Sequence, residues 1–284
     1  MKKIGFVDYY ISEWHANNYP AWIKEACEKD GLEYQLGYVW AELDTSPLDG
    51  KTTNEWCKEF GAEPCETIEE LCEKSDVIVI LSPSFPEKHL GYAKAVLPYG
   101  KPTYIDKTFA PDYKTAKEIF ALGEKYGTKF FSSSALRYAE ELSKCENCNQ
   151  MINTGSGRSV DEYIIHQIEM VVAKLGIGAT AVKAEKVGEQ LFFNVKYPDS
   201  RAAAMIFGKG MSFTIYMNNP ENNPSKILKA ESPFFKNLIA DILRFFETGK
   251  ASFDTNETLE AMAIRETALI AAEAPDAWVE IKRD

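Results

Sequence analysis

The stretch Lys101–Ala110, KPTYIDKTFA, decides how this chain is interpreted, because it places a charged pair directly after a short apolar strand. The expected strand covers residues 103–105, and Asp106 and Lys107 follow it. In open α/β sheets, ligands bind at the carboxyl ends of the strands. A lysine at that edge can give or take a proton when partial burial lowers its pKa, although a solvated Asp-Lys turn is the commoner arrangement. Lys107 is therefore a candidate proton-transfer residue.

The first 130 residues alternate between strand and helix patterns, and Pro20 is expected to start the first helix. The predicted strands cover residues 3–7, 33–40, 77–81, 103–105 and 129–132. The predicted helices cover residues 21–29, 53–60, 67–74, 87–97 and 112–126. Repeated β-α units of this length imply a parallel sheet with right-handed crossovers. This part of the chain is expected to form a doubly wound, Rossmann-like domain.

The pattern changes after about residue 140, where a helix over residues 158–175 precedes several strands without helices between them. These strands cover residues 181–187, 190–197, 202–207 and 212–217, and helices at 234–248 and 255–274 close the chain. Closely spaced strands favour an antiparallel sheet. The predicted fold is α/β, with a Rossmann-like parallel sheet in residues 1–137. An α+β domain with a mostly antiparallel sheet follows in residues 138–284, and its last helices could pack back on the first domain.

Composition excludes several classes of function. Apolar residues make up 45% of the 284 residues and charged residues 26%, which is ordinary for a globular protein. The net charge of −11 argues against general binding to nucleic acid or an anionic membrane. No run approaches the roughly 18 apolar residues of a membrane span, and Asp8 interrupts the apolar start too early for a signal peptide. We expect a cytoplasmic protein.

The six cysteines do not predict a disulfide framework, because cytoplasmic thiols stay reduced. Cys145 and Cys148 have the CxxC spacing of a zinc or redox motif. A second CxxC is missing and no nearby histidine completes four ligands, so we expect no metal there.

The order of these motifs resembles the Gfo/Idh/MocA family of oxidoreductases over nearly the full length. Gly100–Ala110 is similar to the family's strand that ends in Glu-Lys-Pro or Asp-Lys-Pro, with Lys107 at the position of the catalytic lysine. Ser82-Pro83-Ser84 resembles the family's turn after the fourth strand, and Ser132–Tyr138 its strand followed by Arg-Tyr. Asp161–Glu169, which contains His166, resembles the helix that opens the second domain.

The resemblance implies an NAD(P)-dependent oxidoreductase that acts on a hydroxyl or carbonyl group of a sugar, inositol or related polyol. A nicotinamide cofactor, NAD or NADP, would carry the hydride. The resemblance gives Lys107 the role of proton relay, with His166 assisting. It assigns substrate contacts to His15, Arg137, Tyr138 and Glu162. It assigns the cofactor side to Asp8, Glu42, Ser82, Pro83, Asp106 and Lys107. A homodimer or homotetramer is also implied.

His166 has support from the sequence itself, because Glu162 and Glu169 share its face of the predicted helix. A histidine flanked by two carboxylates can act in acid-base chemistry. A buried structural histidine among apolar neighbours is the alternative. Glu42 has a similar alternative as a surface carboxylate. The aromatic residues that follow the first strand fit either a core or the wall of a sugar-binding cleft.

The chain departs from the family at its first loop, which normally has the pattern G-x-G-x-x-G. Asp8, Tyr10 and Glu13 lie at or next to the glycine positions, and no Lys or Arg occurs between residues 8 and 23. Acidic side chains repel a dianionic pyrophosphate. Thr108 also replaces the proline after the catalytic lysine. The alternative is therefore a family-like protein without dinucleotide binding, acting as a lyase, an isomerase or a non-catalytic partner subunit.

Overall fold

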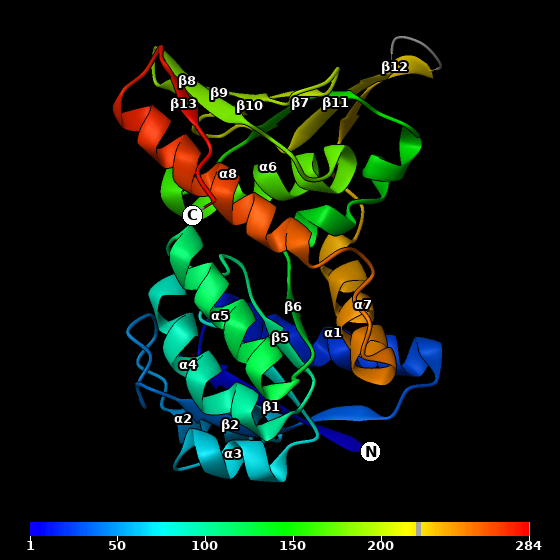
Figure 1. The fold of residues 1–284 in the computed structure, drawn as a ribbon. Coiled ribbons are helices and arrows are strands. Elements are labelled where there is room, and N and C mark those ends of the chain that lie inside the picture. The colour runs from blue at the N-terminus through cyan, green and yellow to red at the C-terminus, as the bar shows by residue number, and fades with distance from the viewer. Residues whose placement is uncertain (220–222, 284) are drawn as a thin grey trace. The chain divides into compact units, whose positions relative to one another are not determined.

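The computed structural model describes residues 1–219 and 223–283, and the chain divides into two compact units (Figure 1). The first unit contains Met1–Pro111, Thr115–Ser132 and Leu238–Phe253, and the second contains the other described residues. The main change of unit falls between Ser132 and Ser133, directly after the last strand of the first sheet.

The first unit is built on a six-stranded sheet in the order β3-β2-β1-β4-β5-β6, in which every pairing is parallel. Its strands are β1 (Lys2–Asp8), β2 (Tyr34–Ala41), β3 (Glu63–Pro64), β4 (Val77–Ile80), β5 (Thr103–Ile105) and β6 (Phe130–Ser132). All of β4 and β5 is buried, as expected for parallel strands covered on both faces. The predicted Rossmann-like sheet is confirmed.

Helices cover both faces of this sheet: α3, α4 and α5 lie on one face, and α1 lies with the later part of α7 on the other (Figure 1). The helices are α1 (Trp14–Asp30), α2 (Thr53–Phe60), α3 (Ile68–Lys74), α4 (His89–Val96), α5 (Tyr113–Tyr126) and α7 (Phe234–Thr248). Thr52 and Glu55 form a reciprocal capping box at α2. At α3, Thr67 caps the helix, while the Glu70 side chain accepts from the amide of Glu66.

The prediction for the first helix was wrong at its start, because α1 begins at Trp14 and Pro20 lies inside it. The Glu13 side chain accepts from the amides of His15 and Ala16 and so caps the helix six residues earlier than the proline signal indicates. A glutamate is not among the preferred cap residues, so its position gave no signal.

The second unit contains a seven-stranded sheet in the order β12-β11-β7-β10-β9-β8-β13. Its strands are β7 (Gln150–Gly155), β8 (Ala181–Val187), β9 (Gln190–Lys196), β10 (Ala202–Phe207), β11 (Thr214–Asn219), β12 (Asn223–Lys229) and β13 (Trp278–Glu280). β7 and β10 pair in parallel, and the other described pairs are antiparallel. The mostly antiparallel sheet is confirmed, but β7, β12 and β13 were not predicted, since β7 is rich in polar residues and glycine.

Two helices, α6 (Val160–Leu175) and α8 (Asn256–Glu273), cover one face of this sheet (Figure 1). The buried Asn153 of β7 and Gln167 of α6 join sheet and helix, because the Gln167 amide donates to the Asn153 side-chain oxygen at 2.8 Å. Within the described part of the chain, none of the helices has the length and apolar character needed to cross a membrane.

Candidate functional site at the carboxyl edge of the first sheet

The segments that follow β1 and β4 are tied together at the carboxyl edge of the first sheet. Asp8 ends β1, and one of its carboxylate oxygens accepts from the amides of Tyr9 at 2.7 Å and Ser82 at 2.9 Å. Ser82 has a positive φ of 64°, a conformation that non-glycine residues seldom adopt. The Ser82-Pro83 turn is therefore fixed against the end of β1.

Lys107 lies at this edge, buried with 7% of its surface exposed. Its Nζ donates to the carbonyl oxygen of Pro83 at 3.1 Å. The neighbouring Asp106 continues the strand contact, because its amide donates to the carbonyl of Ile80 at 2.9 Å. Tyr104 donates to the Asp106 carboxylate at 3.0 Å. The peptide bond between Lys107 and Thr108 is cis. The structure thus brings together Ser82, Pro83, Asp106 and Lys107.

His89, which the sequence did not single out, holds the segment after Lys107. It is fully buried, with Nε2 at 2.7 Å from the carbonyl oxygen of Leu81 and Nδ1 at 3.0 Å from that of Phe109. Burial lowers the pKa of His89, although the two carbonyls oppose that effect. The imidazole links the end of β4 to the loop that follows β5, so it positions the Lys107 loop.

His15 links the first loop to Asp106. Its Nδ1 lies 3.2 Å from a carboxylate oxygen of Glu13, and its Nε2 lies 3.8 Å from the second carboxylate oxygen of Asp106. The structure therefore brings His15, predicted as a substrate residue, to the same edge as Lys107. Both ring nitrogens of His15 thus face carboxylates of the first unit.

Asp8 is an unusual carboxylate for this edge, because it is 1% exposed and one of its oxygens has no hydrogen-bond partner. Burial raises the pKa of Asp8 well above its ordinary value, and the charges of Glu13 and Asp106 add to this. The amides of Tyr9 and Ser82 oppose the shift. Where family members have glycine, this chain has a side chain that resists ionisation.

Glu42 follows β2 and already has partners. Its two oxygens accept from Lys88 Nζ at 2.5 Å and from the Tyr92 hydroxyl at 2.8 Å. Burial works against ionisation, but Lys88 and Tyr92 outweigh it and lower the pKa of Glu42. The carboxylate that was expected to accept ribose hydroxyls is thus charged and bound to side chains of the same unit.

In the second unit, Arg137 lies in the short helix Ala135–Tyr138 and is paired with two carboxylates. Its Nε donates to Glu169 at 2.7 Å and its Nη1 to Glu257 at 2.5 Å. Burial raises the pKa of Glu169, and the charge of Arg137 opposes that effect. This arrangement is an internal ion-pair cluster, whose two carboxylate members the sequence did not identify as partners of Arg137.

His166 contacts a serine that was not predicted. Its Nδ1 lies 2.6 Å from Ser134 Oγ, which also accepts from the amide of Leu136. Of the carboxylates expected beside His166, Glu162 pairs with Arg158 on the same helix, and Glu169 pairs with Arg137. Tyr138 uses its carbonyl to accept from the Asn237 amide at 3.1 Å. The catalytic and substrate roles of these residues stay predictions.

Cys145 and Cys148 are buried free thiols whose sulfurs point to backbone carbonyls of Glu146 and Gln150. Among the residues that the structure describes, no three His, Cys, Asp or Glu side chains are grouped as they would be around a metal ion.

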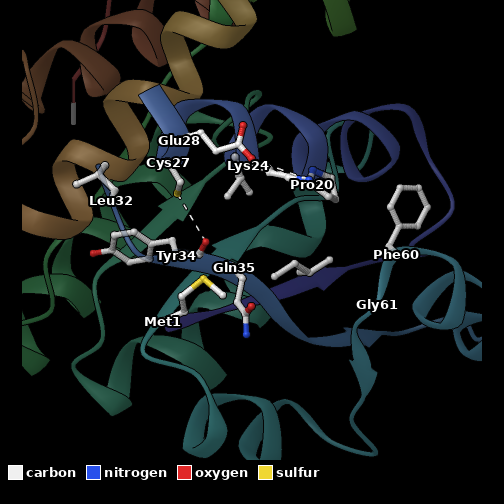
Figure 2. A pocket seen from close by; sticks show the side chains of 12 residues that line it. Met1, Pro20, Lys24, Cys27, Glu28, Leu32, Tyr34, Gln35, Phe60 and Gly61 are labelled. Carbon is white, nitrogen blue, oxygen red and sulfur yellow. Dashed lines mark hydrogen bonds and ion pairs between the residues drawn. The ribbon is translucent and has the colours of Figure 1, made fainter. Parts of the chain in front are cut away.

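A pocket of about 460 Å³ lies elsewhere in the first unit, between α1 and the first residues of β2 (Figure 2). Its lining includes Pro20, Lys24 and Cys27 of α1, together with Tyr34 and Gln35. These strand residues stand at the amino end of β2, whereas Lys107 follows the carboxyl end of β5. The pocket is therefore separate from the candidate site.

Comparison with known families gives a match for part of the chain. Residues 43–134 match the family model GFO_IDH_MocA, described as an oxidoreductase family with an NAD-binding Rossmann fold. The matched range contains Ser82, Pro83, Asp106 and Lys107. It begins after the loop at residues 8–13. No curated protein is similar enough in sequence to match.

Solved structures share the fold at low sequence identity. A putative myo-inositol dehydrogenase from Sinorhizobium meliloti is 13% identical, with 99% of this chain and 100% of that chain covered and a TM-score of 0.79. UDP-N-acetylglucosamine 3-dehydrogenase from Acidithiobacillus ferrooxidans is 13% identical, with 96% and 98% covered and a TM-score of 0.75. Apo scyllo-inositol dehydrogenase from Lactobacillus casei is 14% identical, with 99% and 98% covered and a TM-score of 0.71.

The loop after β1 and the start of α1 show whether the diphosphate of a nicotinamide cofactor could bind in its usual position. In Rossmann domains the pyrophosphate binds at the N-terminus of the helix after the first strand. Here the amides of His15 and Ala16 at that position already donate to Glu13. The neighbouring Asp8 and Glu13 are acidic, so with the loop in this conformation a diphosphate does not fit the usual position.

The remaining features of the first unit agree with the family. The parallel sheet has the 3-2-1-4-5-6 strand order of a Rossmann fold, and the carbonyl of Pro83 accepts from the lysine that follows β5. The family match over residues 43–134 includes that lysine and its turn. Residues 43–134 are thus similar to an oxidoreductase family with an NAD-binding Rossmann fold, and the whole chain shares its fold with solved dehydrogenase structures.

Proposed function

We propose that this chain is an NAD(P)-dependent dehydrogenase or reductase that acts on a hydroxyl or carbonyl group of a sugar, inositol or related polyol. Lys107 would be its proton relay. The observation that carries the proposal is the position of Lys107: it is buried at the carboxyl edge of the parallel sheet and its Nζ contacts the Pro83 carbonyl. This edge is where open α/β sheets bind their ligands.

The contacts around Lys107 suit a group that moves a proton. In an oxidation, a neutral Lys107 Nζ would take the proton from the substrate hydroxyl, and in a reduction the ammonium would return a proton to the carbonyl oxygen. The Pro83 carbonyl accepts one Nζ hydrogen and so fixes the direction of the others. Asp106, held by Tyr104 and by the backbone of Ile80, anchors the loop that carries the lysine.

The resemblance supplies further roles that belong to the proposal. His166 would assist the proton transfer, and Tyr138, Glu162 and His15 would orient the substrate. Arg137 fits such a role less well, because its side chain is 6% exposed and is bound to Glu169 and Glu257. A homodimer or homotetramer and a small polyol-like substrate complete the proposal.

The cofactor part is tested by calorimetric titration of the purified chain with NAD(H) and NADP(H). Measurable binding supports the proposal, and absence of binding at millimolar concentration contradicts it. Because the related structures include inositol and UDP-N-acetylglucosamine dehydrogenases, myo-inositol, scyllo-inositol and UDP-N-acetylglucosamine are suitable first substrates. Turnover is followed by nicotinamide absorbance.

Lys107→Ala should abolish turnover of whichever substrate is active, while cofactor affinity stays within about threefold of the parent value, because the lysine acts on the substrate proton. Lys94→Ala is the control, since Lys94 is an exposed lysine of α4 in the same unit. Full activity of Lys107→Ala would exclude the proton-relay role.

One observation favours the alternative of a protein without a dinucleotide, acting as a lyase, an isomerase or a partner subunit. The amides at the start of α1 are bound by Glu13, and Glu42 is bound by Lys88 and Tyr92. The same titration separates the two functions, because the alternative requires that neither nicotinamide cofactor binds.

A further inference from the structure

The N-terminus of α1 is bound by a carboxylate of the chain itself. Glu13 Oε1 accepts from the amide of Ala16 at 2.5 Å, and Oε2 accepts from the amide of His15 at 2.9 Å. Glu13 is 6% exposed. Free amides at a helix N-terminus form an anion-binding site. Here an internal anion already occupies that site.

Other contacts hold Glu13 in this position. His15 Nδ1 lies 3.2 Å from Glu13 Oε2, and the opposite ring nitrogen lies 3.8 Å from Asp106. The backbone is fixed as well, because the Glu13 amide donates to the carbonyl of Ile11 at 2.8 Å and its carbonyl accepts from Asn17 at 2.9 Å. The carboxylate is thus part of a built network and not a surface side chain that happens to fold back.

The loop that carries Glu13 is also joined to the loop after β4. The rings of Tyr9 and Phe85 have their centroids 4.8 Å apart, and those of Tyr10 and Phe85 5.9 Å apart. Lys88 lies over the Tyr9 ring at 4.5 Å and also pairs with Glu42. Glu42, the acidic residue after β2, therefore has partners within the first unit, as Glu13 has.

We infer that Glu13 is an internal competitor for the diphosphate of the nicotinamide cofactor, so that dinucleotide binding requires the Glu13 carboxylate to leave the N-terminus of α1. This inference rests on the proposed function. Two anions cannot accept from the same two amides, and an unmoved Glu13 would also repel the incoming phosphates. The contact is autoinhibitory, because the same hydrogen bonds that cap α1 oppose the cofactor.

The test compares the affinity of NADH for the parent chain, Glu13→Ser and Glu28→Ser, measured by calorimetry. Serine still caps a helix through its short hydroxyl, but it removes the charge and frees space. Glu28→Ser removes the same charge from an exposed position on the same helix. We expect Glu13→Ser to bind NADH at least about 10-fold more tightly than the parent, and Glu28→Ser to stay within about twofold.

Thermal melts followed by circular dichroism establish that each variant is folded, and Glu13→Asn, a second good cap residue, replaces the serine variant if that one does not fold. If Glu13→Ser binds NADH with the parent affinity, or more weakly, the inference is overturned and the cofactor assignment stands. If no chain binds NADH or NADPH at millimolar concentration, the dinucleotide assignment and the inference both fail.

Discussion

Both units bury carboxylates, but they satisfy them in different ways. In the first unit, Asp8 and Glu13 are held chiefly by backbone amides, and Asp106 by the Tyr104 hydroxyl and His15. In the second unit, Glu169 and Glu257 are both held by the guanidinium of Arg137. The contacts named for the first unit come from amides, a hydroxyl and a histidine, whereas in the second unit a permanently charged guanidinium lies between two carboxylates.

This difference determines how firmly the carboxylates of each unit are fixed. An arginine stays charged and fixes its partners, so removal of either side leaves a buried charge without a partner. Backbone amides can exchange one acceptor for another, and a carboxylate that resists ionisation, such as Asp8, can change its protonation state. The cluster near Lys107 therefore lacks the guanidinium partner that fixes Glu169 in the second unit.

The largest effect is expected from breaking the arginine cluster. Arg137→Met should reduce the free energy of unfolding by about 3–5 kcal/mol, because the buried Glu169 and the partly buried Glu257 lose their partner. Arg158→Met is the control, since Arg158 also pairs with a glutamate but its side chain is 66% exposed; it should cost less than about 1 kcal/mol. Denaturant unfolding followed by circular dichroism measures both. Equal losses of unfolding free energy in the two variants would show that the Arg137 cluster stabilises the fold no more than a surface ion pair does.

A smaller effect of opposite sign is expected at Asp8. The pKa of Asp8 in the folded chain lies above the ordinary value of 3.8. At a pH between the unfolded-state pKa and the folded-state pKa, the folded chain therefore binds more protons than the unfolded chain. The free energy of unfolding then falls as the pH rises through this range. Asp8→Asn keeps an acceptor for the amides of Tyr9 and Ser82 and removes this penalty. It should stabilise the fold by about 1 kcal/mol near pH 8, with the gain shrinking toward about pH 4.

The measurement for Asp8 is denaturant unfolding of the parent and variant at both pH values, with the exposed Asp30→Asn as control. The control should show no pH-dependent difference. A gain for Asp8→Asn that is the same at both pH values, or a loss near pH 8, would contradict the burial penalty.

The smallest effect is expected at the cap of α1. Glu13→Ala removes the side chain that accepts from the amides of His15 and Ala16 and should cost about 1 kcal/mol, whereas Glu13→Ser should cost only a few tenths. Thermal melting of the two variants checks the order. If the Glu13→Ala and Glu13→Ser variants are equally stable, the capping hydrogen bonds contribute little to stability. The amides at the start of α1 would then be available to another acceptor at little cost.

Part of the site follows from the sequence because it depends on local pattern. Lys107 was placed at a strand end by the apolar residues 103–105, and Ser82-Pro83 by the strand before it. Parallel pairing then brings both to one edge of the sheet. The contacts of His89 and Glu13 could not be predicted, because the first bonds two carbonyls far apart in the sequence and the second is an uncommon cap residue.

The sequence by itself determined the alternation of strands and helices, the change to an antiparallel pattern, and the absence of glycines in the first loop. The first two are periodic patterns of apolar residues among sequence neighbours. The third follows directly from the residues of the loop. Only the tertiary structure decided that Arg137 pairs with Glu257, 120 residues away, and that Glu13 occupies the amides of α1. Which charges become partners depends on where the folded backbone brings them, because electrostatic and hydrogen-bond contacts act at short distance through space and leave no periodic signal along the chain.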